Sequence, residues 1–182
     1  MKYYSLNNPA HVASFEHAVL KGLAPDKGLY FPSNLPKLPS GFFTRLGSLT
    51  KQEIAYEAIR EYIGSEIPRE DLEDIIARTL DFEFPVVELQ EKVHILELFH
   101  GPTMAFKDVG ARFMAGCLEY FIKKGNYGKV TVLVATSGDT GGAVANGFLG
   151  ADNIDVVILY PKGKVSDIQE KQLTTLGQNI KA

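Results

Sequence analysis

A lysine near the middle of the chain occupies an unusual place for a cation. Lys107 follows the loop 100–106 (HGPTMAF) and opens an apolar helical pattern that reaches Lys124. A cation in the first turn of a helix faces the positive end of the helix dipole, which costs up to about 1 kcal/mol on an exposed surface. With partial burial, this position favours the neutral amine, which can attack an aldehyde and form a Schiff base. A lone lysine beside Asp108 is more often a solvated charge, so the interpretation depends on the neighbouring sequence.

A second loop has the composition of a small-anion site. Residues 136–142 (TSGDTGG) directly follow the apolar run Val130 to Ala135. Glycines let a backbone approach its ligand closely, and the N–H groups at a helix start bind carboxylates or phosphates. The loop lacks the glycine and lysine spacings of Walker loops and dinucleotide-binding loops, which disfavours a nucleotide. By itself, the loop is equally compatible with a strand-to-helix turn that needs glycine for tight packing.

Both loops belong to a regular alternation of helices and strands. After residue 99 the pattern predicts helices at 107–124, 140–148 and 167–176 and strands at 130–135 and 156–160. Ser166 and Gln169 form a capping box at the start of the last helix, and another strand begins near Asn179. This alternation predicts βαβ units on a parallel sheet, where ligands collect at the carboxyl ends of the strands.

The N-terminal part of the chain lacks this alternation. Residues 25–49 are rich in Pro, Gly and Ser and predict a long loop with one short strand at 29–31. A capping box at 50–53 opens a helix that ends at Gly64, and Pro68 opens a second helix. Extended runs at 86–89 and 93–99 predict adjacent strands or a hairpin. The predicted fold class is therefore α/β, with a mixed α+β N-terminal region over 1–82 and the first part of an α/β domain, incomplete, over 83–182.

Composition argues against several classes of function. The 182 residues are 45% hydrophobic and 23% charged, as in an ordinary folded protein. A net charge of -3 without a basic stripe gives no reason to expect nucleic acid as a partner. No run approaches the roughly 20 apolar residues of a membrane span, so we expect a cytoplasmic protein. The single Cys117 is expected in the core, and the four histidines lack the spacing of metal ligands, so no metal site is expected.

The two loops together closely resemble those of threonine synthases. Residues 99–108 (FHGPTMAFKD) and 135–141 (ATSGDTG) carry the resemblance, and 28–32 and 157–166 extend it over almost the whole chain. The resemblance implies the tryptophan synthase β-like fold of the fold-type II pyridoxal-phosphate (PLP) enzymes. It also implies the conversion of O-phospho-L-homoserine and water to L-threonine and phosphate. Serine and threonine dehydratases and cysteine synthases share this fold but usually have Asn where Asp139 stands.

The resemblance also implies roles for individual residues. Lys107 would carry pyridoxal 5'-phosphate as a Schiff base and move protons on the substrate, while Phe106 and Asp139 would lie against the cofactor. The residues implied to bind the substrate are Thr103, Ser137, Gly138, Thr140 and Gly141. Because this family continues well beyond 182 residues and binds the cofactor phosphate in its later part, residues 1–182 alone are expected to be inactive. Another fold-type II lyase, such as a threonine/serine dehydratase, and a non-catalytic fragment are the alternatives.

Overall fold

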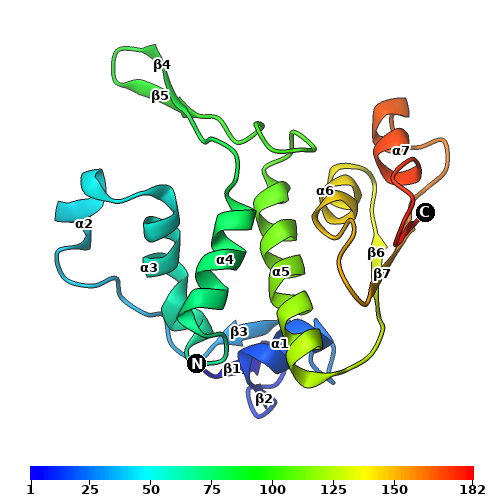
Figure 1. Cartoon of the computed structure of the whole chain (residues 1–182), viewed down its shortest axis with the longest axis horizontal. Helices are drawn as coiled ribbons and strands as arrows, with labels where there is room; N and C mark the ends of the chain where they lie inside the picture. The colour runs from blue at the N-terminus through cyan, green and yellow to red at the C-terminus, as the bar shows by residue number, and fades with distance from the viewer. The chain divides into compact units, whose positions relative to one another are not determined.

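The chain folds into two compact units. The computed structural model describes residues 1–182, which divide into Met1–Arg78 and Thr79–Ala182. The first unit contains a three-stranded antiparallel sheet, and the second contains a two-stranded antiparallel hairpin and a three-stranded parallel sheet (Figure 1). The predicted fold class, a mixed N-terminal region followed by βαβ units, is therefore confirmed.

The first unit combines its small sheet with four α-helices. Strand β1 (Tyr3–Ser5) lies between β2 (Val12–Ala13) and β3 (Tyr30–Pro32) and is antiparallel to both. The predicted strand at 29–31 corresponds to β3, whereas β1 and β2 were not predicted. The helical segments are α1 (Phe15–Lys21), α2 (Phe42–Arg45), the short 3-10 helix η1 (Leu46–Ser48), α3 (Lys51–Ile63) and α4 (Arg69–Thr79).

Two kinds of cap define the helices of this unit. The predicted capping box of α3 is present: the Glu53 carboxylate accepts from the Thr50 N–H at 2.7 Å, and the Thr50 hydroxyl accepts from the Glu53 N–H at 3.2 Å. The hydrogen bonds from Thr50 lower the pKa of Glu53. Helix α1 has the Ser14 hydroxyl as its N-cap, which accepts from the His17 N–H at 3.0 Å. It also has a second cap, because the Glu66 carboxylate accepts from the N–H groups of Phe15 at 2.9 Å and Glu16 at 2.8 Å. This cap comes from a residue about fifty positions away in the sequence.

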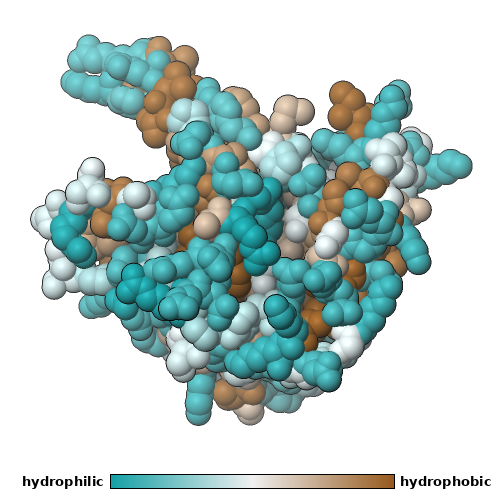
Figure 2. All heavy atoms as spheres, in the orientation of Figure 1, coloured by the Kyte–Doolittle hydropathy of each residue, from teal (hydrophilic) through white to brown (hydrophobic).

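The second unit begins with a hairpin of exposed strands. Strands β4 (Val86–Gln90) and β5 (Val93–Leu96) pair antiparallel, as predicted, and all of their residues are exposed. Figure 2 shows hydrophobic residues along this hairpin. The second strand was predicted to reach Phe99 but ends at Leu96. Beyond it the chain turns, with a Glu97 to His100 contact at 2.6 Å and stacked Phe99 and His100 rings.

Helices and parallel strands alternate through the rest of this unit. The elements are α5 (Lys107–Gly125), β6 (Val130–Ala135), α6 (Asp139–Gly147), β7 (Ile154–Leu159), α7 (Asp167–Thr174) and β8 (Ile180–Lys181). Strand β7 lies at the centre and is parallel to both β6 and β8. Every helix and strand predicted after residue 99 is present, with boundaries that differ by two residues or fewer.

One face of the parallel sheet is covered and the other is open. Ile154, Val156 and Ile158 of β7 are almost completely buried, at 0–2% exposed. The alternate positions share the opposite face, where Leu133 is 67% and Leu159 55% exposed. A sheet of this kind is normally covered on both faces, so the open face exposes apolar surface that is typical of an interior.

The core of the second unit forms where α5 packs against α6. Phe121 of α5 and Phe148, just after α6, are completely buried. A Cβ at Gly147 would lie 3.0 Å from the Ala111 backbone, so glycine allows the two helices to approach closely. Cys117 is buried in this core, as predicted, and burial raises the pKa of its thiol to about 12.

Candidate functional site

The structure places Lys107 at the start of a long helix. Lys107 is the first residue of α5, and its side chain is partly buried. Its Nζ lies 5.7 Å from the centre of the Phe106 ring, and this ring is 65% exposed. The predicted combination of a cation with the positive end of a helix is therefore confirmed.

The neighbouring carboxylate is held by the loop before the helix. Asp108 is 1% exposed and accepts hydrogen bonds from the backbone N–H of Thr103, at 2.9 Å, and from the Thr103 hydroxyl. A Cβ at Gly101 would lie 2.5 Å from Asp108 Oδ2, so the loop closes around this carboxylate only with glycine at that position. Asp108 thus fixes the turn that leads into Lys107.

A second contact ties the start of α5 to the chain that precedes the hairpin. The Arg112 guanidinium donates to Asp81 at 2.7 Å and lies 5.9 Å from the centre of the Phe82 ring. Phe82 also lies close to Gly101, since a Cβ there would be 3.0 Å from its ring. The turn before Lys107 is therefore held by hydrogen bonds from Thr103 to Asp108 and by contact between Gly101 and the Phe82 ring.

The glycine-rich loop after β6 is organised by a threonine that was not among the predicted site residues. The Thr136 hydroxyl accepts from the N–H groups of Gly138 at 3.1 Å and Gly141 at 2.9 Å. These two N–H groups are therefore used inside the loop. The first N–H groups of an α-helix have no partner within the helix, and Asp139 and Thr140 occupy the first two positions of α6. Thr136 precedes the glycines in the sequence, but nothing in the sequence shows where its hydroxyl points.

The side chain of Asp139 makes a contact with α7. Its Oδ1 accepts from Gln169 Nε2 at 2.7 Å. The predicted site residues Ser137, Asp139 and Thr140 are exposed, whereas Gly138 and Gly141 are buried. The loop therefore presents two hydroxyls and a carboxylate on a backbone whose glycines are packed.

A shallow pocket lies beside the first loop. It has a volume of about 350 Å³ and is lined by Pro102 and Thr103, by Gly142 and Asn146 of α6, and by Lys171 and Gln172 of α7, among others. Helices α5 and α6 pack together and begin at the same end of this unit (Figure 1). Among the predicted site residues, only Thr103 lines this pocket. The structure thus brings the two loops to one end of the unit.

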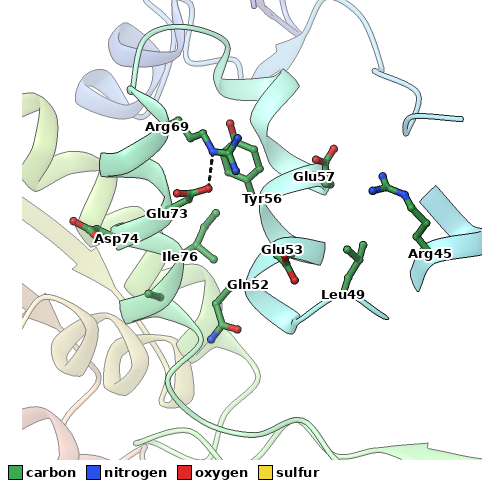
Figure 3. Close-up of a pocket in the computed structure, with 11 residues that line it drawn as sticks. Arg45, Leu49, Gln52, Glu53, Tyr56, Glu57, Arg69, Glu73, Asp74 and Ile76 are labelled. Atoms are coloured by element: carbon green, nitrogen blue, oxygen red, sulfur yellow. Dashed lines mark hydrogen bonds and ion pairs between the residues drawn. The ribbon is translucent and has the colours of Figure 1, made fainter. Parts of the chain in front are cut away.

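A larger pocket in the first unit contains none of the predicted site residues. It has a volume of about 410 Å³ and lies along α3 and α4 (Figure 3). One ion pair lies within it: Arg69 donates to Glu73 at 2.7 Å and lies over the Tyr56 ring at 5.0 Å. The candidate site is therefore placed at the two loops, where the predicted residues lie.

No group of three or more His, Cys, Asp or Glu side chains is arranged to hold a metal ion. None of the helices combines the length and the apolar character needed to cross a membrane.

Comparison with known proteins gives one consistent answer. A family model described as the threonine synthase N terminus matches residues 2–80. A threonine synthase of Haemophilus influenzae is 44% identical over 181 residues, which cover 100% of this chain and 41% of that protein. The crystal structure of the Escherichia coli threonine synthase matches with a TM-score of 0.86 at 44% identity, over 99% of this chain and 41% of that one. A PLP-bound threonine synthase of Brucella melitensis matches with a TM-score of 0.88 at 38% identity, over 96% and 38% of the two chains.

The fold and these matches agree on the class of protein that the chain resembles. Its antiparallel and parallel sheets are those of a fold-type II PLP fold. Within that class, the chain is similar in sequence and in fold to the N-terminal portion of threonine synthases. It spans about 41% of the length of the curated relatives that it matches.

Proposed function

We propose that this chain forms the N-terminal portion of a PLP-dependent threonine synthase that converts O-phospho-L-homoserine and water to L-threonine and phosphate. The proposal includes a division into an N-terminal region, 1–82, and the first part of the cofactor-binding domain, 83–182. The observation that carries it is the position of Lys107 at the first residue of α5, in a turn fixed by the buried Asp108.

The residues around Lys107 fit a cofactor that is attached through an amine. Attack on an aldehyde requires a lysine that is reachable and not tied up in an ion pair. The adjacent carboxylate, Asp108, is turned into the loop and bound by Thr103. The exposed ring of Phe106 beside the amine offers an apolar surface for a flat heteroaromatic ring.

Within this proposal, Lys107 is the catalytic residue. The chemistry supplied by bound PLP is the withdrawal of electrons from the substrate carbons. The Lys107 amine would take protons from the substrate α- and β-carbons as a general base and return protons to the γ- and α-carbons as a general acid, while water supplies the hydroxyl at the β-carbon. The fixed turn before α5 would keep the amine in place during these transfers.

The loop 136–142 would bind the substrate carboxylate. Ser137 and Thr140 would donate their hydroxyls, and the N–H groups at the start of α6 would add further donors. Gly138 and Gly141 would contribute backbone shape, since their N–H groups are bonded to Thr136. Asp139 would lie towards the cofactor, and Thr103 would border the substrate beside the pocket that it lines.

The test is a comparison of two reactions catalysed by the natural full-length protein supplied with PLP. Phosphate release from O-phospho-L-homoserine is expected, with much slower formation of a ketoacid from L-threonine. Ketoacid formation as the faster reaction would identify a dehydratase of the same fold. The absence of both reactions would contradict an enzymatic role of this kind.

A further inference from the structure

The amide of Gln169 is engaged at both of its ends. Gln169 is the third residue of α7, whose N-cap is Ser166. Its Oε1 accepts from the Ser166 N–H at 3.2 Å and from the Ser166 hydroxyl at 3.1 Å, which completes the capping box. Its Nε2 donates to Asp139 Oδ1 at 2.7 Å. One side chain therefore caps α7 and holds a residue of the loop after β6.

The chemistry of the two partners fixes the orientation of this amide. The oxygen and nitrogen of a glutamine are usually distinguished only through their partners. Here the Ser166 N–H can only donate, and an ionised carboxylate can only accept. If the amide were flipped, its NH₂ group would face the Ser166 N–H and its oxygen would face the Asp139 carboxylate, and neither pair could form a hydrogen bond. Gln169 therefore presents its NH₂ group to Asp139.

The same amide lies against the backbone of Gly138. A Cβ at this position would be 2.5 Å from Gln169 Nε2 and 2.8 Å from its Cδ. Gly138 also has φ 153°, within the range that residues with side chains rarely adopt. The loop is thus fixed from inside by Thr136 and from the side of α7 by Gln169.

We propose that Gln169 is a positioning residue for the substrate loop, which holds the Asp139 carboxylate as an acceptor and keeps the loop in its binding shape. This inference rests on the proposed function, because it assigns Asp139 and its loop to the active site. Gln169 occupies Oδ1 of Asp139 and thereby sets the direction of Oδ2. The capping box of α7 and the shape of the substrate loop then depend on one amide.

The test separates capping from positioning with Gln169→Glu. Glutamate at the third helical position completes a capping box as well as glutamine does, so the cap of α7 is kept. The new carboxylate faces Asp139 and cannot donate to it. The partner variant is Asp139→Asn. The double variant combines the two substitutions, so that the amide at position 139 can donate to the carboxylate at position 169. Gln178→Glu is the matched control, because it makes the same charge change at an exposed residue beyond α7.

Each variant is made in the natural full-length protein, and two properties are measured. Gln169→Glu is expected to lower kcat/KM for O-phospho-L-homoserine by about tenfold or more, which corresponds to ~1.4 kcal/mol, and to lower Tm by about 2–4 °C. The same change made on top of Asp139→Asn is expected to cost less than about threefold, because the new amide donates to the new carboxylate.

The positioning role would be overturned if Gln169→Glu lowered kcat/KM equally in the unsubstituted protein and in Asp139→Asn. It would also be overturned if Gln169→Glu lowered kcat/KM no more than Gln178→Glu does. If Asp139→Asn abolishes turnover, the same comparison of the four Tm values decides, because the proposal requires the effects of the two substitutions on Tm to be non-additive. If the unsubstituted protein shows no threonine synthase activity, the proposed function fails, and the Tm comparison still tests the contact.

Discussion

The fixed turn before Lys107 can be tested by removing a single hydroxyl. Thr103→Val keeps the shape of the side chain and the backbone donor to Asp108 but deletes the hydroxyl donor. A hydrogen bond to a charged group is worth roughly 1.5–3 kcal/mol, and its loss is felt fully where the acceptor is buried. Asp108 is 1% exposed, so water cannot replace the lost donor. We therefore expect the free energy of unfolding to fall by about 1.5–3 kcal/mol.

The assay is urea unfolding of the natural full-length protein, followed by far-UV circular dichroism. With an m-value of about 2 kcal/mol/M, the midpoint should fall by roughly 0.75–1.5 M. Thr103→Ser keeps a hydroxyl and should lose much less, and Thr131→Val, at an exposed position on β6, should change little. The idea that this hydroxyl fixes the turn would be refuted if the urea midpoint of Thr103→Val matched that of the Thr131→Val control. It would also be refuted if Thr103→Val and Thr103→Ser lowered the midpoint equally.

The glycine-rich loop, the buried thiol and the exposed apolar surface of the second unit can each be tested separately. Ser137→Ala and Thr140→Val should each reduce turnover of O-phospho-L-homoserine by roughly tenfold or more, because a hydrogen bond to a charged group is worth about 1.5–3 kcal/mol. PLP should still attach to both variants. Unchanged kinetics in both variants would reject the loop 136–142 as the site of the substrate carboxylate. Cys117, whose pKa is raised to about 12, should resist iodoacetamide between pH 7 and 9 in the folded protein and react once the protein is unfolded. The free energy of unfolding should also fall as pH rises above the thiol's ordinary pKa near 9.0, because the unfolded state then loses the proton that the folded state keeps. Rapid labelling of the native protein would contradict the burial of Cys117. Residues 1–182 expressed alone should self-associate through the hairpin and the open sheet face, which size-exclusion chromatography would detect. They should also release no phosphate from O-phospho-L-homoserine. A monodisperse and active chain would contradict both expectations.

Local sequence signals predicted the second unit well. Strand β6 has the predicted bounds, and α5 begins at the predicted Lys107. These elements are marked by apolar runs, glycines and capping residues within a few positions of their ends. The first unit was harder, because β1 and β2 have only three and two residues and show no periodicity. Helix α1 was missed although Ser14 caps it, since its second cap comes from Glu66.

The candidate site was predictable in its residue types but not in its contacts. The sequence left open whether the glycines of the loop serve the approach of a ligand or tight packing, and in the structure a Cβ at Gly138 would meet Gln169 and one at Gly141 would meet Thr136. It could not show that Thr136 takes up their N–H groups, because that depends on the direction of one hydroxyl. The capping box of Ser166 and Gln169 predicted the start of α7. The contact from Gln169 to Asp139 joins residues thirty positions apart, so it appears only in the folded chain.

Lys107 is proposed to carry the cofactor as a Schiff base, and reduction of that bond gives a direct test. The natural full-length protein is incubated with PLP, reduced with borohydride, digested and mapped by mass spectrometry, with Lys107→Ala as the control. We predict a single stable pyridoxyl adduct on the peptide that contains Lys107, and its absence in the variant. An adduct on another lysine, or equal labelling of the Lys107→Ala variant, would contradict the assignment.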